Sequence, residues 1–180
     1  MRHFLMVLVF ATLLVLTGCR ATDKTQGTPA VEEEKPTIGT VIKAVKENPL
    51  RGRRWTKLAE HSVDLDGDLV EEQVELYTAA LRDPQGELMW DDGQEWRLLV
   101  RDGQTVYPLF SGYVQLGSVY FVLGAGDSER PSEVIVLITT GTGLSLSSYS
   151  YSKEKNGFVE EGEFTSRSNN IMYSSIQGYR

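Results

Sequence analysis

Apolar and polar residues alternate along most of the chain after Trp55, and this period of two predicts β-strands in that part. In residues 118–124, for example, Val119, Phe121 and Leu123 fall on one face of an extended strand. Eight segments carry such a pattern: residues 56–63, 70–79, 95–101, 105–110, 118–124, 133–139, 144–151 and 158–164. The pattern therefore predicts antiparallel strands that bury one face each in a common core.

Polar turn residues separate these segments and support hairpins between them. Asp102-Gly103 and Asn156-Gly157 are pairs typical of two-residue type I′ turns, in which both central residues have positive φ. Residues 134–138 form a continuous apolar run, which predicts a strand covered on both faces. The expected fold class is all-β: a single antiparallel β domain, built as a sandwich or as propeller-blade-like sheets, with one short N-terminal helix.

The helix is predicted from a different spacing at the start of the domain. Ile38, Val41, Ile42 and Val45 lie at i, i+3, i+4 and i+7, which forms one apolar stripe on a helix. Because β-branched residues are weak helix formers, this helix is expected to pack on the sheet. The β domain with its short leading helix is therefore expected to span residues 38–180.

The beginning of the chain combines a positive charge with a short apolar run. Arg2 precedes residues 4–16, thirteen residues in which Thr12 is the one polar side chain. As a helix this run rises roughly 20 Å, which is less than the ~30 Å hydrocarbon core of a bilayer. The pattern therefore indicates a secretory signal peptide and an extracytoplasmic protein.

The sequence Leu16-Thr17-Gly18-Cys19 follows, and it resembles the lipobox of bacterial lipoproteins. The resemblance implies a signal peptide of residues 1–18, a diacylglycerol group on the Cys19 sulfur and a further acyl chain, such as palmitate, on the new N-terminus. The protein is then expected at the cell membrane or the outer membrane, held through the lipid on Cys19. The alternative is an ordinary signal peptide cleaved near Ala21, which leaves a free cysteine.

Residues 19–37 are interpreted as the lipidated cysteine and a flexible tether. The eighteen residues after Cys19 contain no aromatic residue and no leucine, but they hold two prolines and the acidic run 32–34. Such a composition cannot bury enough apolar area to fold, and a flexible coil of this length spans on the order of 20–25 Å.

The charge of the chain restricts its partners. It carries 18 Lys and Arg against 25 Asp and Glu, a net charge of −7, which argues against nucleic acid as a partner. Repulsion from anionic lipid favours a domain held away from the membrane surface. Arg51, Arg53, Arg54 and Lys57 form a local basic cluster. This cluster either contacts lipid headgroups or an acidic polymer, or it is a solvated entrance to the first strand.

The candidate ion site consists of carboxylates that alternate along the segment before the second predicted strand. Asp64, Asp66 and Asp68 stand at positions 1, 3 and 5 and Glu72 at position 9, a spacing from which a tight turn can gather oxygens around calcium. The single cysteine and the two histidines of the chain offer no comparable set of ligands.

Residues 64–78 resemble the calcium loops of FG-GAP and VCBS β-repeats, in which the loop precedes an outgoing strand. The resemblance implies that these four carboxylates bind calcium. The pattern departs at position 6, where such loops carry glycine and this chain has Leu69, a residue that avoids positive φ. The alternative is a polar hairpin without an ion, in which the Asp66-Gly67 pair supplies the turn.

Together these patterns predict an exported, lipid-anchored envelope protein that acts as a non-catalytic binding or interaction module, stabilised by calcium. The expected partner is an envelope protein or a glycan. The alternative is a small extracytoplasmic hydrolase or accessory enzyme that uses acidic residues, such as the pairs Glu71/Glu72 and Asp91/Asp92. A deep pocket with two inward carboxylates would favour the enzyme.

Overall fold

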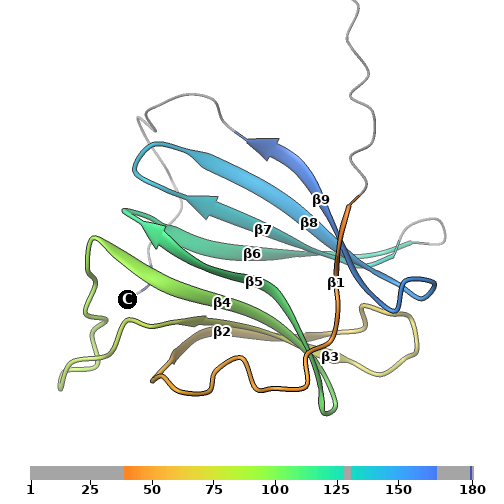
Figure 1. Cartoon of the computed structure of the whole chain (residues 1–180), viewed down its shortest axis with the longest axis horizontal. Helices are drawn as coiled ribbons and strands as arrows, with labels where there is room; N and C mark the ends of the chain where they lie inside the picture. The colour runs from red at the N-terminus through yellow and green to blue at the C-terminus, as the bar shows by residue number, and fades with distance from the viewer. Residues whose placement is uncertain (1–38, 128–130, 166–178, 180) are drawn as a thin grey trace, which may run out of the picture. The chain divides into compact units, whose positions relative to one another are not determined.

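The computed structural model describes residues 39–127, 131–165 and 179 of the chain. The predicted signal peptide, residues 1–18, and the tether, residues 19–37, lie outside this part. The described residues form nine strands (Figure 1), and no helix among them could cross a membrane. The strands are β1 (Thr40–Ile42), β2 (Thr56–Val63), β3 (Glu72–Thr78), β4 (Gly93–Asp102), β5 (Thr105–Gln115), β6 (Ser118–Gly124), β7 (Glu133–Thr139), β8 (Leu144–Ser152) and β9 (Gly157–Thr165).

The strands pair antiparallel in two sheets. One sheet has the order β2-β3-β4-β5 and the other the order β1-β9-β8-β7-β6. Consecutive strands from β2 to β9 are neighbours, except where the chain passes from β5 to β6 and so from one sheet to the other. β1 lies beside β9, and just after it Val45 forms a bridge with Val106 of β5. The start of the domain therefore contacts both sheets.

The inner faces of the two sheets share one hydrophobic core. Trp96, Leu98 and Val100 of β4 are fully buried on one side of it, and Val134 and Val136 of β7 lie on the other. Each pair of buried neighbours is two residues apart, as the pleat of a strand requires. Burial of each large apolar side chain contributes roughly 1.5–3 kcal/mol. The predicted all-β fold class is confirmed, as two sheets around one core.

A second, smaller cluster covers the outer face of the β2–β5 sheet. Tyr77, Leu99 and Val106 are buried there, and Leu50 and Trp55 pack on them from the segment between β1 and β2. This segment therefore lies across the outer face of the sheet. It explains why Leu99 is fully buried although it points away from the main core.

Most of the predicted strands are confirmed. Residues 56–63, 118–124 and 133–139 form strands with the predicted ends, and the other five differ by a few residues. The apolar run in β7 differs from the prediction in its burial. Alternate side chains such as Val134 are buried, but Ile135 is half-buried, so the outer face of β7 is covered only in part.

The helix predicted over residues 38–45 is wrong where that segment is described. Thr40–Ile42 form β1 and pair with residues 158–160 of β9. Threonine, valine and isoleucine favour extended backbone because their branched side chains are restricted at χ1. The edge of β9 offers backbone hydrogen bonds to residues 40–42. A single helical turn would form its own hydrogen bonds only after the entropic cost of nucleation had been met.

Both predicted hairpins are present, but their turns differ from the type I′ geometry. Asp102 pairs with Thr105, so the turn begins one residue later, with Gly103 at φ 54°. In the second hairpin Asn156, at φ 46°, ends a loop of residues 153–156. One left-handed residue in each turn therefore replaces the predicted pair.

The passage from β5 to β6 constrains the backbone tightly. Leu116 has φ 49°, and its amide donates a hydrogen bond to the Asp92 carbonyl (2.6 Å). A Cβ atom on Gly117 would lie 1.8 Å from the carbonyl oxygen of Thr139. Glycine is therefore required at the point where the chain changes sheets.

Gly117→Ala is expected to lower the free energy of unfolding by roughly 3 kcal/mol, because the backbone must move to admit the methyl group. Gly162→Ala in β9 is the matched control, since a Cβ there meets nothing within 4 Å. Urea unfolding of both variants measures the difference. Equal stability of the two would contradict the tight passage between the sheets.

Candidate metal centre

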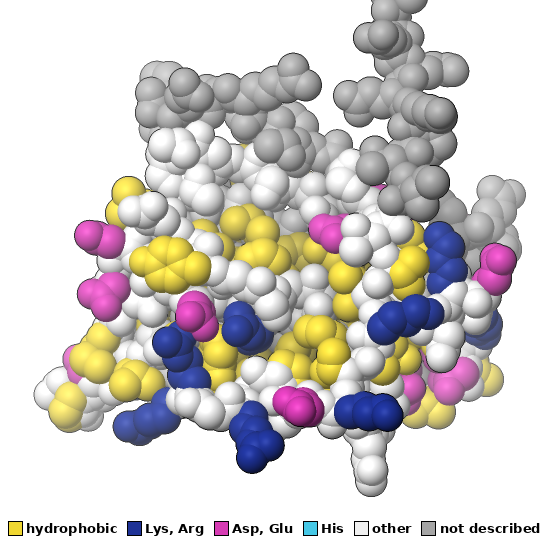
Figure 2. Space-filling view, in the orientation of Figure 1, with side chains coloured by type: hydrophobic (Ala, Val, Ile, Leu, Met, Phe, Trp, Pro, Cys, Tyr) yellow, Lys and Arg dark blue, Asp and Glu magenta, His cyan; other side chains and the backbone are white. Residues whose placement is uncertain are grey.

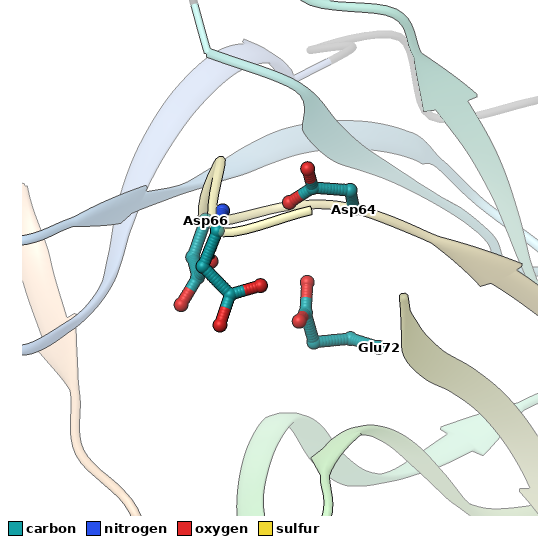
Figure 3. Close-up of side chains that lie close together, drawn as sticks. Asp64, Asp66 and Glu72 are labelled. Atoms are coloured by element: carbon teal, nitrogen blue, oxygen red, sulfur yellow. The ribbon is translucent and has the colours of Figure 1, made fainter. Parts of the chain in front are cut away.

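The register of β2 and β3 positions the acidic loop. Val63, the last residue of β2, pairs with Glu72, the first residue of β3, so residues 64–71 must turn back within this span. Figure 3 shows the result: the carboxylates of Asp64, Asp66 and Glu72 point toward a common space.

Asp64 holds the turn of the loop together. Its Oδ1 accepts a hydrogen bond from the Gly67 amide (2.7 Å), and its Oδ2 accepts one from the Leu69 amide (3.1 Å). Gly67 has φ 74° and Leu69 has φ 72°. The loop therefore adopts positive φ at position 6, with a leucine where calcium loops carry glycine.

Asp66 and Asp68 form local turns of the Asx kind, and Glu72 lies in the interior. Asp66 Oδ1 accepts a hydrogen bond from the Asp68 amide (3.0 Å), and Asp68 Oδ1 accepts one from the Val70 amide (2.8 Å). Glu72 is only 3% exposed, and its Oε2 accepts from the Leu65 amide (2.6 Å). Each ionised carboxylate keeps free lone pairs, since it offers about four acceptor positions.

The structure brings all four predicted ligands together. Asp64, Asp66, Asp68 and Glu72 each offer one oxygen, and these oxygens lie within 4.8 Å of one another. Oxygens on opposite sides of calcium are roughly 4.6–5.2 Å apart. The four oxygens are therefore close enough to share one calcium ion.

Without a cation, the surroundings of Glu72 and Asp66 disfavour the ionised forms of their carboxyl groups. Burial raises the pKa of the Glu72 carboxyl above its ordinary value of 4.5, and repulsion from Asp66, Asp102 and Asp64 adds to the rise. Burial, followed by repulsion from Asp68, raises the pKa of Asp66 above 3.8 in the same way. A cation bound among these carboxylates would remove this penalty.

Side chains from four other strands complete the surroundings of Asp66 and Glu72. They enclose with these two carboxylates a narrow hollow that is too small to admit a water molecule, and they are Asp102, Tyr107, Tyr151 and Phe158. Sequence reasoning treated Asp102 as a turn residue only. Its position at the tip of the next hairpin along the chain is the one signal that could have placed it near the acidic loop.

A wider groove of about 420 Å³ lies beside the same loop. Asp64 and Asp66 line it together with Ser132, Tyr151 and Lys153. Burial raises the pKa of Tyr107, the neighbour of Tyr151 in the hollow, to about 12, so this phenol stays protonated at neutral pH.

The other predicted chemistry is not gathered in one place. Cys19 lies outside the described residues. Glu71 is exposed while Glu72 is buried, because neighbouring residues of an extended chain point to opposite sides. Asp91 and Asp92 are exposed in the connection between β3 and β4. Neither acidic pair therefore forms two carboxylates that face one pocket.

No protein-family model matches the chain, and no curated protein or solved structure is significantly similar to it. The candidate site is therefore defined by its geometry. That geometry is a short loop whose four carboxylates converge at one end of two packed sheets.

Leu69→Gly is expected to raise the free energy of unfolding by about 1 kcal/mol, since a left-handed L-residue costs roughly that much. The Leu69 side chain is 92% exposed, so its removal loses no packing. Val70→Gly is the control, because Val70 is 60% exposed but has no positive φ. It is expected to lose about 0.5–1 kcal/mol. Chemical unfolding in chelator compares the two, and a loss of stability in both would contradict the left-handed Leu69.

Proposed function

We propose that the protein is an exported, lipid-anchored module of the cell envelope that binds a partner without catalysis and is stabilised by calcium in its acidic loop. The anchor is supported by the sequence: Arg2, the apolar residues 4–16 and the lipobox ending at Cys19. One acyl chain binds a membrane only marginally, but two or more hold a domain there stably. The location that follows is extracytoplasmic, at the cell membrane or the outer membrane.

The observation that carries the calcium proposal is the convergence of four carboxylate oxygens within 4.8 Å, one of them from a buried residue. Asp64, Asp66, Asp68 and Glu72 supply hard oxygen ligands. The Val70 carbonyl at position 7 and water would complete the six to eight ligands that calcium takes. The bound ion would also offset the burial and the repulsion that together raise the pKa of Glu72.

The size of the space between Asp66 and Glu72 argues against hydrolysis at this pair of carboxylates. The hollow lined by Asp66 and Glu72 is too small to admit a water molecule, whereas small-molecule sites measure roughly 300–1,000 Å³. It therefore has no room for a sugar unit between these two carboxylates. The groove of about 420 Å³ outside it presents Ser132, Tyr151 and Lys153. These groups can stack on and hydrogen-bond to a glycan or a polar protein surface.

Calcium is expected to raise the melting temperature of the wild-type protein, because an ion that binds only the folded state stabilises it by mass action. A tenfold excess over the dissociation constant gives about 1.4 kcal/mol. Glu72→Gln is expected to lose most of this shift, and Glu71→Gln, at the exposed neighbour, is expected to keep it. Calorimetry in chelator, millimolar calcium and millimolar magnesium measures the shift. The absence of a shift with calcium, or an undiminished shift in Glu72→Gln, contradicts the site.

The same variants follow the opposite order in chelator. Because the pKa values of Glu72 and Asp66 are raised, the folded protein without metal binds protons more tightly than the unfolded chain. Their contribution to stability is complete below the ordinary values of 4.5 and 3.8, and it is lost as the pH rises through the raised values. Glu72→Gln should therefore exceed the wild type in stability at neutral pH in chelator, while Glu71→Gln should match it.

The lipid anchor is tested separately with Cys19→Ala. The wild-type protein isolated from cells is expected to begin at Cys19 and to carry the added mass of acyl chains, and the variant is expected to carry none. Intact-mass spectrometry is the measurement, because an uncleaved signal peptide could itself keep the variant on the membrane. A wild-type chain that begins at Met1 without lipid would refute the anchor.

A further inference from the structure

Although the chain has a net charge of −7, its charges are separated in space. Cationic side chains gather on the outer surface of the β2–β5 sheet and on the segment that crosses it, in the lower part of Figure 2. We call this surface the basic face. Its cationic residues are Lys46, Arg51, Arg53, Arg54, Lys57, Arg97 and Arg101.

The register of the sheet and the second apolar cluster together build this face. Lys57 lies opposite Tyr77, and Tyr77 lies opposite Arg97, so these side chains form one row across three strands. Leu50 and Trp55 fix the preceding segment onto the same side of the sheet. The basic cluster seen in the sequence is therefore joined by cations of β4, which lie far from it along the chain.

Acidic partners on the face keep its sheet cations in fixed positions. Glu75 is 4% exposed and pairs with Lys57 (2.7 Å) and with Arg101. Burial opposes ionisation of Glu75, but the hydrogen bonds from these two cations lower its pKa nonetheless. Glu95 pairs with Arg53 (2.7 Å). The face is therefore an ordered ion-pair network and not a set of independent side chains.

Aromatic rings add to this order. The Arg97 guanidinium lies over the Trp55 ring, 4.9 Å from its centroid, and the Lys57 ammonium lies 5.6 Å from the centroid of Tyr77. A hydrogen bond to Glu60, together with the one to Glu75, raises the pKa of Lys57 well above its usual value. Lys57 therefore remains charged throughout the neutral range.

Three cations of the face have no acidic partner within the described part of the chain. Lys46, Arg51 and Arg54 are exposed and form no ion pair there. The seven cations are accompanied by four acidic residues, so the face has a net charge of +3. The acidic residues are Glu47, Glu60, Glu75 and Glu95. The rest of the protein is accordingly more negative than its total charge suggests.

We propose that the basic face docks on the anionic phospholipid headgroups of the membrane that carries the lipid anchor. The inference rests on the anchoring proposed above, because a tether of on the order of 20–25 Å keeps the domain close enough for weak charge attraction to act. The unpaired cations on the face supply the charge complementarity. Docking turns this face toward the bilayer and the acidic remainder of the domain away from it.

The experiment measures docking in the lipidated protein, reconstituted in vesicles of phosphatidylcholine alone or with phosphatidylglycerol. A fluorophore is attached to a cysteine at Glu47→Cys on the basic face, and quenching by a spin label on the lipid headgroups reports contact. A second site, Val122→Cys, lies 58% exposed on β6 of the other sheet and serves as the control. The chain has one cysteine of its own, Cys19, which the anchor occupies.

Quenching at position 47 is expected in the phosphatidylglycerol vesicles only, and it is expected to disappear at high salt. Arg51→Glu is expected to lower the ratio of docked to undocked protein roughly fivefold or more, the effect of about one cation at an anionic surface. Lys155→Glu makes the same charge change in the β8–β9 loop and is expected to leave the ratio unchanged.

Equal quenching in both kinds of vesicle, or an unchanged ratio in Arg51→Glu, would overturn the proposal. Binding of a soluble polyanion without quenching by either vesicle would also overturn it and would assign the face to an acidic polymer. The intact mass of the isolated protein tests the lipid anchor independently. If no lipid is attached, sedimentation with phosphatidylglycerol vesicles tests the docking proposal. Binding that is weakened by Arg51→Glu supports the proposal, and the absence of binding overturns it.

Discussion

The pairing of Val63 with Glu72 determines where the carboxylates of the candidate metal centre lie. This register is held because β3 buries alternate residues such as Val74 and Leu76, and a slip by one position would turn them outward. The residues between β2 and β3 must therefore reverse direction in a short loop. The first residue of β3, Glu72, consequently has its carboxylate in the interior. The left-handed Leu69 follows from the same constraint, because a loop of this length closes only if the backbone bends sharply at several points. Core packing thus sets the geometry of the acidic cluster.

The sequence predicts those features that local spacing decides. Alternation is local, so β2, β6 and β7 were predicted with their observed ends, and the four ligands of the acidic loop lie within nine residues. Asp102 and Tyr151 could not be placed, since their approach to the loop depends on how the two sheets pack. The error at residues 40–42 has the same origin. Their spacing fits a helix or a strand, and the edge of β9, distant along the chain, decides between them.

Net charge is a property of the whole chain, whereas the electrostatic attraction of a charged surface is largely screened beyond about 8 Å at physiological salt. The prediction of repulsion from anionic lipid treated the domain as a uniformly negative body. The structure separates the charges instead, because β-strand pairing places Arg97 and Arg101 beside Lys57 on one outer face. Glu75 becomes a buried member of this network rather than an exposed negative charge. The separation could not be read from composition, since it depends on which strands lie side by side.

A left-handed leucine and a buried carboxylate among other carboxylates both cost stability, and a plain polar hairpin needs neither. Glycine at position 69 would relieve the first cost, and an uncharged residue at position 72 would relieve the second. Backbone conformations of this kind persist where the surroundings over-determine them, and they cluster at ligand sites. In this loop the hydrogen bond from the Leu69 amide to Asp64 holds Leu69 in place, while the hydrogen bond from the Leu65 amide offsets only part of the burial and repulsion at Glu72, whose pKa stays raised. A divalent cation would compensate the remaining burial and repulsion at Glu72, whereas a simple chain reversal would leave them in place.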